Sequence, residues 1–301
     1  MVRNLLKYCI SFLLYFWHNQ LLSQDIVYII AKKGTAYYSI DNQSWRKINT
    51  GDRLNSNGYL KVDTLSYLAI VVNQKQGFEL KKPGIYAISN FLQDKNITDE
   101  KTNESLRYVI SMATSRSGIN SSGLTLGAIS RGINETKIYT PKKTVFFSDS
   151  VVFSWKECNN CSGYQILILN KDGEVVYKHV ITNKKDTTVK LDLTELTESA
   201  KKYYFKINTI GGNINYSNVA HSFVILNSKE FWMIKSERDY ILQAVDTSSA
   251  LGCFLVGLFY ESYNMYAYAL YYYNKAIDIS GGASEYIDRK NAMLNKITTI
   301  E

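Results

Sequence analysis

Alternating hydrophobic and polar positions run through residues 26–92 and 136–226, and a helical period replaces them from residue 227 onward. Strict alternation predicts strands with one buried face, whereas apolar residues at i, i+3, i+4 and i+7 predict amphipathic helices. In the first region, about six short strands separated by turns such as Pro83-Gly84 indicate a compact β-barrel or sandwich. The sequence therefore predicts a multidomain α+β protein.

The second β-region contains seven strand patterns, and Asp172-Gly173 is a strong hairpin turn between two of them. Seven short strands in one such region predict an immunoglobulin-like sandwich. The alternation places these side chains in its core: Phe153, Trp155, Ile166, Ile168, Tyr203, Phe205 and Ile207.

Between the two β-regions, residues 93–135 predict one helix and a linker. Leu106, Val109 and Ile110 fall on one face of the helix, and Thr98 or Thr102 would cap its N-terminus. The glycines and serines of residues 115–132 then break all periodicity, which is typical of a linker or flexible loop.

Residues 227–301 predict a run of helices. Asn227 and Glu230 form a plausible capping pair for the first, and Asp246 is expected to cap the second. Asn264 separates the second helix from the third, which ends at Ser280-Gly281-Gly282, and residues 284–300 predict a last helix.

Three resemblances accompany these patterns. Residues 24–92 resemble the FecR-type periplasmic domain, in Gly34, in Gly51-Asp52-Arg53-Leu54, in Val62-Asp63-Thr64 followed by 66–70, and in FELKKPGIYAIS, which matches a closing hairpin. Residues 136–226 resemble a fibronectin type III domain, in Trp155, Gly163-Tyr164, and Leu196 seven residues before Tyr203. The first resemblance implies an envelope-signalling or structural module, and the second implies a module that spaces other domains or binds ligands through its loops.

The third resemblance is to a tetratricopeptide repeat. The small and aromatic positions of that pattern are Gly257, Tyr260, Tyr266, Ala269, Tyr273 and Ala276. The resemblance implies two closely packed antiparallel helices with Tyr260, Tyr266 and Tyr273 in the core. It also implies a concave groove at Leu251, Phe254, Leu258 and Glu261, covered by the helix at 228–244 or by a partner.

Two more tyrosines of the same helix, Tyr268 and Tyr272, lie with Lys275 on the face away from Ala269 and Ala276. They would pack against the final helix or the sandwich, or form an exposed stripe for a partner protein. Leu251, Phe254, Leu258, Tyr268 and Tyr272 are therefore the candidate partner-binding residues.

The first residues carry the pattern of a secretory signal peptide. Arg3 and Lys7 precede an apolar run that is about half the length a membrane-spanning helix needs. Cleavage after residue 23 would leave no integral membrane span, and it predicts an extracytoplasmic protein in the periplasm or at the cell surface.

Composition excludes several classes. The hydrophobic share of 46% and the charged share of 21% are those of a globular protein. The net charge of +8 is spread along the chain, which argues against nucleic acid. Cys158 and Cys161 form a CxxC that predicts a tight local disulfide or a plain turn, with a redox pair as the alternative.

We find no catalytic, cofactor-binding or metal-binding motif in the sequence, so the protein is expected not to be an enzyme. The domains are predicted as signal peptide (1–23), FecR-like β-domain (24–92), helix and linker (93–135), Ig/fibronectin III-like sandwich (136–226) and tetratricopeptide-like helical domain (227–301). The predicted role is that of a scaffold or protein–protein interaction protein of the bacterial envelope. Binding of cell-wall glycan or polysaccharide, signal relay with a membrane partner and thiol oxidoreduction by Cys158 and Cys161 are the alternatives.

Overall fold

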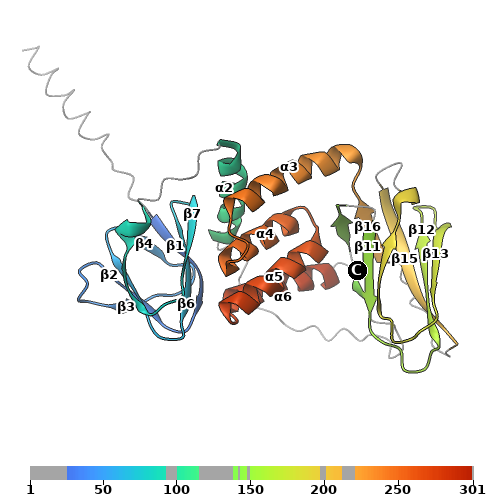
Figure 1. The fold of residues 1–301 in the computed structure, drawn as a ribbon, viewed down its shortest axis with the longest axis horizontal. Coiled ribbons are helices and arrows are strands. Elements are labelled where there is room, and N and C mark those ends of the chain that lie inside the picture. Colours follow the sequence, from blue (N-terminus) through green and yellow to red (C-terminus); the bar gives the residue numbers. More distant parts are fainter. Residues whose placement is uncertain are drawn as a thin grey trace, which may run out of the picture.

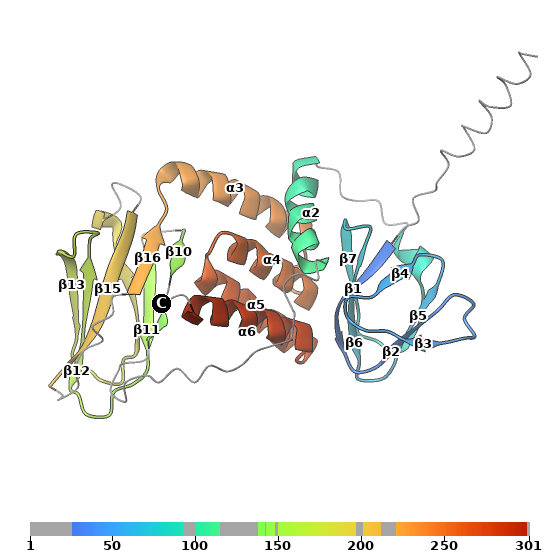
Figure 2. The ribbon, with the colours of Figure 1, turned by 180° about the vertical axis from the view of Figure 1, so that it is seen from behind.

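The computed structural model describes residues 26–92, 100–114, 138–141, 143–147, 150–196, 201–211 and 221–299. A β-sandwich, a block of helices and a second β-sandwich follow one another along the long axis (Figure 1), and the view from behind in Figure 2 shows the same order. The helices that end the chain thus lie in the middle of the molecule. The predicted signal peptide and the Gly/Ser-rich residues 115–132 lie outside the described residues.

The first sandwich consists of two four-stranded sheets with strand orders β4-β1-β6-β7 and β3-β2-β5-β8. Its strands are β1 (Ile26–Lys33), β2 (Ala36–Ser39), β3 (Arg46–Lys47), β4 (Arg53–Asn55), β5 (Tyr59–Val62), β6 (Tyr67–Val72), β7 (Gln76–Leu80) and β8 (Gly84–Ala87), followed by the 3-10 helix η1 (Ile88–Phe91). Strand β4 lies in the Gly-Asp-Arg-Leu element and was not among the predicted strands.

The closing hairpin predicted for FELKKPGIYAIS is wrong. Strand β7 pairs with β6 in one sheet, whereas β8 pairs with β5 in the other, so the Pro83-Gly84 turn carries the chain across the sandwich. The alternation of apolar and polar residues shows which side chains of a strand are buried, but it does not show which other strand lies beside that strand. A hairpin and a crossover between the two sheets therefore have the same local sequence pattern.

Strand β6 is buried along its whole length because both of its faces are covered. Leu68 and Ile70 point into the core between the two sheets. Tyr67, Ala69 and Val71 point the other way, into a second core that they share with the helices. The helical block therefore covers the outer face of the first sandwich.

The second sandwich confirms the predicted immunoglobulin-like fold. Its sheets have the orders β14-β11-β9 and β10-β16-β15-β12-β13. The strands are β9 (Ile138–Thr140), β10 (Thr144–Phe146), β11 (Ser150–Trp155), β12 (Gly163–Leu169), β13 (Val175–Ile181), β14 (Thr188–Asp192), β15 (Lys201–Ile210) and β16 (His221–Ile225), with the 3-10 helix η3 (Thr194–Leu196) before β15.

The predicted core of this sandwich is confirmed, since all seven residues expected there are buried in one cluster. The Asp172-Gly173 turn joins β12 and β13 as an antiparallel hairpin, and Gly173 adopts a φ of 84°. The Tyr203 hydroxyl donates a hydrogen bond to the backbone carbonyl of Leu196. This contact, known from immunoglobulin-like sandwiches as a tyrosine corner, fixes the chain where it enters β15.

The described residues also form five α-helices: α2 (Glu100–Thr114), α3 (Ser228–Ala244), α4 (Ala250–Ser262), α5 (Tyr266–Ser280) and α6 (Ser284–Thr299). The predicted apolar face of α2 and the predicted ends of α3 and α5 are confirmed. In α2, Leu106, Val109 and Ile110 are buried. At the start of α3, the Asn227 side chain accepts a hydrogen bond from the Glu230 N–H at 2.9 Å. Helix α5 is followed by Gly281, which adopts a φ of 67°.

Of the two caps predicted for α2, Thr102 is wrong, because it lies inside the helix, which begins at Glu100, whereas Thr98 lies outside the described residues. The predicted cap of α4 is also wrong. The N-cap residue of α4 is Ser249, whose hydroxyl oxygen accepts a hydrogen bond from the Gly252 N–H. Asp246 does not cap the helix, because its carboxylate accepts from the Ser248 N–H at 2.8 Å in a turn that precedes α4. The pKa of Asp246 is lowered by its hydrogen bonds from Ser248.

The tyrosine corner leads to a first prediction. We expect Tyr203→Phe to lose one buried hydrogen bond and to lower the free energy of unfolding of the second sandwich by about 1 kcal/mol. Tyr204→Phe is the matched control, because Tyr204 lies on the outward side of the same strand. Urea denaturation of both variants measures the difference, and equal unfolding midpoints would contradict the structural role of the Tyr203 hydroxyl.

Candidate functional site

The antiparallel hairpin of α4 and α5 forms the centre of the molecule. Gly257 allows the two helices to approach closely, because a Cβ atom at this position would lie 2.5 Å from the Tyr273 ring. Ala269 and Ala276 are fully buried on the facing side of α5. Tyr260, Tyr266 and Tyr273 are buried beside them, which confirms the prediction that these three rings are core.

Glu261 lies buried in this core and is paired with Arg289 of α6. The guanidinium donates two hydrogen bonds, from Nε to Oε2 and from Nη2 to Oε1, each of 3.0 Å. The Tyr273 hydroxyl donates to the same carboxylate at 2.5 Å. Burial raises the pKa of Tyr273, so the phenol stays protonated as a donor. In the sequence, this ion pair is indicated only by Glu261 itself, the one charged residue in the largely apolar α4.

The apolar groove positions Leu251, Phe254 and Leu258 are each no more than 6% exposed. The Phe254 ring packs against Tyr286 of α6 at a centroid distance of 4.6 Å, and Leu251 lies against Gly77 of β7. These residues therefore do not form a free surface, and the prediction that they bind a partner is wrong. These residues are covered by α6 and by the first sandwich, whereas the sequence predicted that the helix at 228–244 or a partner would cover them.

The first junction joins the sandwich to the helices through Glu79 of β7. Its Oε1 accepts hydrogen bonds from the Tyr67 hydroxyl at 2.7 Å and from the Leu251 N–H at 2.6 Å, and its Oε2 lies 2.7 Å from Lys81 Nζ. The Leu251 N–H belongs to the first turn of α4, where a carboxylate also interacts favourably with the helix dipole.

Tyr286 extends this hydrogen-bonded group into α6. Its hydroxyl lies 2.9 Å from the Tyr67 hydroxyl. Because the Tyr67 proton is donated to the Glu79 carboxylate, Tyr286 must donate to the Tyr67 oxygen. Burial raises the pKa values of both tyrosines far above their ordinary value. No local sequence pattern marks Glu79, Tyr67 and Tyr286 as a group, because Tyr67 and Tyr286 are 219 positions apart along the chain.

Further polar contacts reinforce the first junction. The Glu285 carboxylate of α6 accepts from the Lys32 N–H at 3.1 Å and from the Thr50 hydroxyl. Lys33 Nζ donates to the Gly281 carbonyl at 2.5 Å, at the C-terminal end of α5. These bonds connect the first sandwich to the ends of α5 and α6.

The second junction joins the helices to the second sandwich through aromatic rings. Phe147, which follows β10, contacts the rings of Phe231, Tyr260 and Tyr268 at centroid distances of 5.7, 6.1 and 6.1 Å. The Arg238 guanidinium lies 5.2 Å from the Phe147 centroid. A backbone hydrogen bond of 3.0 Å from the Val145 N–H to the Asn264 carbonyl fixes the same junction.

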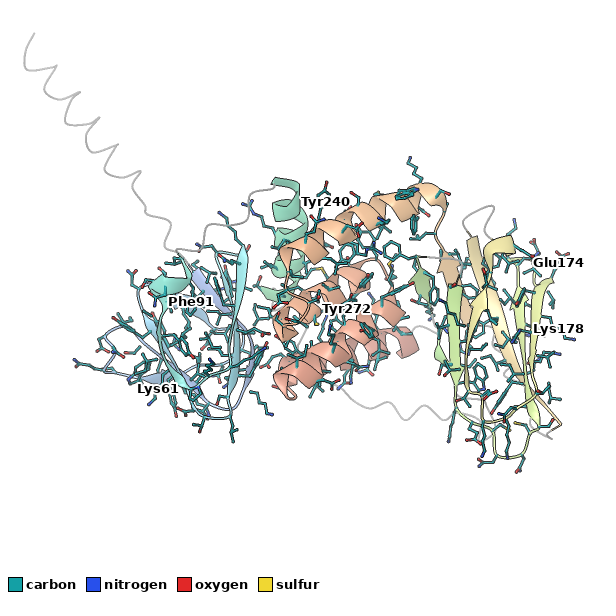
Figure 3. All side chains as sticks on the ribbon, viewed as in Figure 1. Lys61, Phe91, Glu174, Lys178, Tyr240 and Tyr272 are labelled. Carbon is teal, nitrogen blue, oxygen red and sulfur yellow. The ribbon has the colours of Figure 1, made fainter. Side chains whose placement is uncertain are left out.

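Of the two candidate partner-binding tyrosines, Tyr268 lies in this second junction, where its ring also contacts Phe146 at 6.3 Å. Tyr272 is half-buried and stacks on Tyr260 at 5.6 Å (Figure 3 labels Tyr272 within the block). Of the arrangements predicted for these two rings, packing against the second sandwich is therefore the one that Tyr268 adopts. Tyr271, which is 62% exposed, is the ring of this stretch that faces solvent.

The two cysteines of the CxxC are free thiols in the structure. Cys161 Sγ lies 3.7 Å from the Cys158 carbonyl oxygen in the loop between β11 and β12. Burial raises the pKa of the Cys161 thiol.

A cavity of about 450 Å³ lies at the first junction, between β7, α2 and the start of α4. Among its polar lining side chains, those of Glu79, Asp246 and Ser249 are already hydrogen-bonded within the protein. Over the part of the chain that the structure describes, we find no cluster of acids, histidines and cysteines that could hold a metal ion. No described helix is both long and apolar enough to span a membrane.

No family model matches the chain, and no curated protein matches it. Among solved structures, it is similar to CopC from Methylosinus trichosporium OB3b over 31% of this chain and 95% of that chain, with 16% sequence identity and a TM-score of 0.24. It is similar to the FN1–FN3 domains of chicken CNTN1 over 67% of this chain, with 8% identity and a TM-score of 0.24. The match spans 54% of the CNTN1 fragment.

The Glu79 contacts lead to a second prediction. We expect Glu79→Ala to leave both sandwiches folded but to loosen the first junction, since it removes the acceptor for Tyr67 and Leu251 and costs about 2 kcal/mol. Small-angle X-ray scattering should show a larger radius of gyration. Glu157→Ala, an exposed change in the second sandwich, is the control. An unchanged scattering curve and unchanged stability would contradict this role of Glu79.

The buried tyrosines lead to a third prediction. A phenol with a raised pKa in the folded state stabilises the fold below its unfolded pKa and loses this contribution as the pH rises. We expect the stability to fall above the ordinary tyrosine pKa of 10.0. Tyr286→Phe should make this fall shallower, and the exposed change Tyr271→Phe should not. Urea unfolding at a series of alkaline pH values measures the slope, and the same slope in all three proteins would refute the argument.

Proposed function

We propose that this protein is a non-enzymatic scaffold of the bacterial envelope that holds two β-sandwiches at a fixed separation for protein partners. The observation that carries the proposal is the shared hydrophobic core, in which side chains of β1 and β6 pack with those of all five helices and with Phe147. Interfaces this apolar hold domains in one relative orientation, whereas small polar ones allow domain motion.

The two junctions support a fixed arrangement in different ways. The first combines apolar packing with the directional hydrogen bonds of Glu79 and Glu285. The second combines aromatic packing around Phe147 with one backbone hydrogen bond. Directional bonds set the register of an interface that apolar packing alone would leave variable.

The proposal includes two family assignments, FecR-like for the first sandwich and tetratricopeptide-like for the helical block. The motifs at Gly34, Gly51-Asp52-Arg53-Leu54 and Val62-Asp63-Thr64 support the FecR-like assignment. The packing of Gly257, Ala269 and Tyr273 supports the tetratricopeptide-like one. The groove of such a repeat would be occupied within this chain, so partners would bind elsewhere. The signal-peptide pattern of residues 1–23 supports an extracytoplasmic location, in the periplasm or at the cell surface.

Crosslinking in intact cells, followed by fractionation and mass spectrometry, tests the function. We expect the native protein in the extracytoplasmic fraction, crosslinked to a defined set of envelope proteins. Glu79→Ala should retain fewer of them, because partners that contact both sandwiches need the fixed separation, and Glu157→Ala should retain all. A cytosolic location would refute the proposal, as would retention on peptidoglycan with no crosslinked protein, which favours glycan binding.

A further inference from the structure

Strand β13 occupies the free end of the five-stranded sheet. It pairs with β12 on one side, and no described strand pairs with its other side. Figures 1 and 2 place β13 at the end of the molecule farthest from the first sandwich, whereas β10 and β16 lie next to the helices. The unpaired edge is therefore turned away from the rest of the protein.

This edge carries two features that weaken strand pairing, a β-bulge at Val176, where the register with β12 shifts between Ile168 and Leu169, and the charged Lys178, but it lacks others. It spans seven residues without a proline, and its outward side chains Val176 and Val180 are 40% and 47% exposed. Between them lies the exposed Lys178, which Figure 3 shows at the far end of the sandwich. A long apolar edge strand is a template for the addition of another strand.

The sheet face beside this edge is basic. Register places Leu167 of β12 next to Lys178 and next to Lys206 of β15, so the three side chains form one row across the sheet. The outward positions described for β12, β13, β15 and β16 contain three lysines and no acid: Gln165, Leu167, Leu169, Val175, Val176, Lys178, Val180, Lys202, Tyr204, Lys206, Asn208, Ile210, Ser222 and Val224. Glu174, in the turn before β13, is engaged by the Asn170 side-chain amide at 2.8 Å.

We propose that the β13 edge binds an extended acidic segment of a partner protein, which adds to the sheet as a further strand. This inference rests on the proposed scaffold function and names the surface that it uses. Side chains on one face of the added strand lie opposite Val176, Lys178 and Val180, so that face requires the order apolar, acidic, apolar at alternate positions. Main-chain hydrogen bonds supply affinity, and the Lys178 contact supplies selectivity.

A second copy of this chain is the competing occupant. Pairing of β13 with β13 would bring two basic faces side by side, which like-charge repulsion disfavours. An acidic segment neutralises the same face. The charge of the sheet therefore favours a partner over self-association.

A synthetic peptide in which Val, Glu and Val alternate with Thr is the probe, and the protein without residues 1–23 is the binder. We expect saturable binding by calorimetry together with slowed amide hydrogen exchange in β13. Lys178→Glu should weaken binding about tenfold or more. A peptide with Lys in place of Glu should bind more tightly to the Lys178→Glu variant than to the native protein. Lys190→Glu, the same exposed charge change on β14 of the other sheet, should bind the Glu probe like the native protein.

The proposal is overturned if the native protein does not bind the Glu probe, if Lys178→Glu binds it equally well, or if protection appears outside β13. A concentration-dependent dimer with β13 protected in the absence of the probe would assign the edge to a second copy instead. If the edge proposal fails while the native protein still crosslinks to envelope proteins, the scaffold function stands and its contact surface lies elsewhere.

Discussion

The burial of β6 on both of its faces is the constraint on which the arrangement of the molecule depends. One face closes the first sandwich, and the other contributes Tyr67, Ala69 and Val71 to the core of the helical block. A strand this apolar would expose a large hydrophobic patch if the sandwich stood alone, and exposed patches of that kind favour association. The helices are therefore a required cover for the sheet, and the sheet equally covers Leu251 of α4.

Two carboxylates, the half-buried Glu79 and the buried Glu261, give this packing a defined geometry. Glu79 connects β7 to the first turn of α4, and Glu261 connects α4 to α6 through Arg289. Burying an acid is costly unless it is paired and hydrogen-bonded, so each of these groups favours one relative position of the elements around it. The tyrosines act similarly, because their rings fill the core while their hydroxyls donate to these same acids.

A fixed central block has a consequence for how the protein meets others. The helices occupy the inner side of each sandwich, so the outer end of each sandwich is left uncovered by them. Strand β13 lies at such an end, with exposed valines beside lysines. The packing that buries Leu251 and Phe254 of α4 also separates this edge from the first sandwich by the whole helical block.

The sequence by itself determined most of the elements and their buried faces, because alternation, helical period, Asn227, Gly173 and Gly281 act through neighbours along the chain. Phe153, Tyr203 and Tyr273 were identified as core for this reason. Only the tertiary structure decided that β7 and β8 lie in different sheets, that Leu251 is covered, and that Glu79 binds the first turn of α4. Glu79 and Leu251 are 172 positions apart, and a local pattern carries no information about contacts between residues so distant.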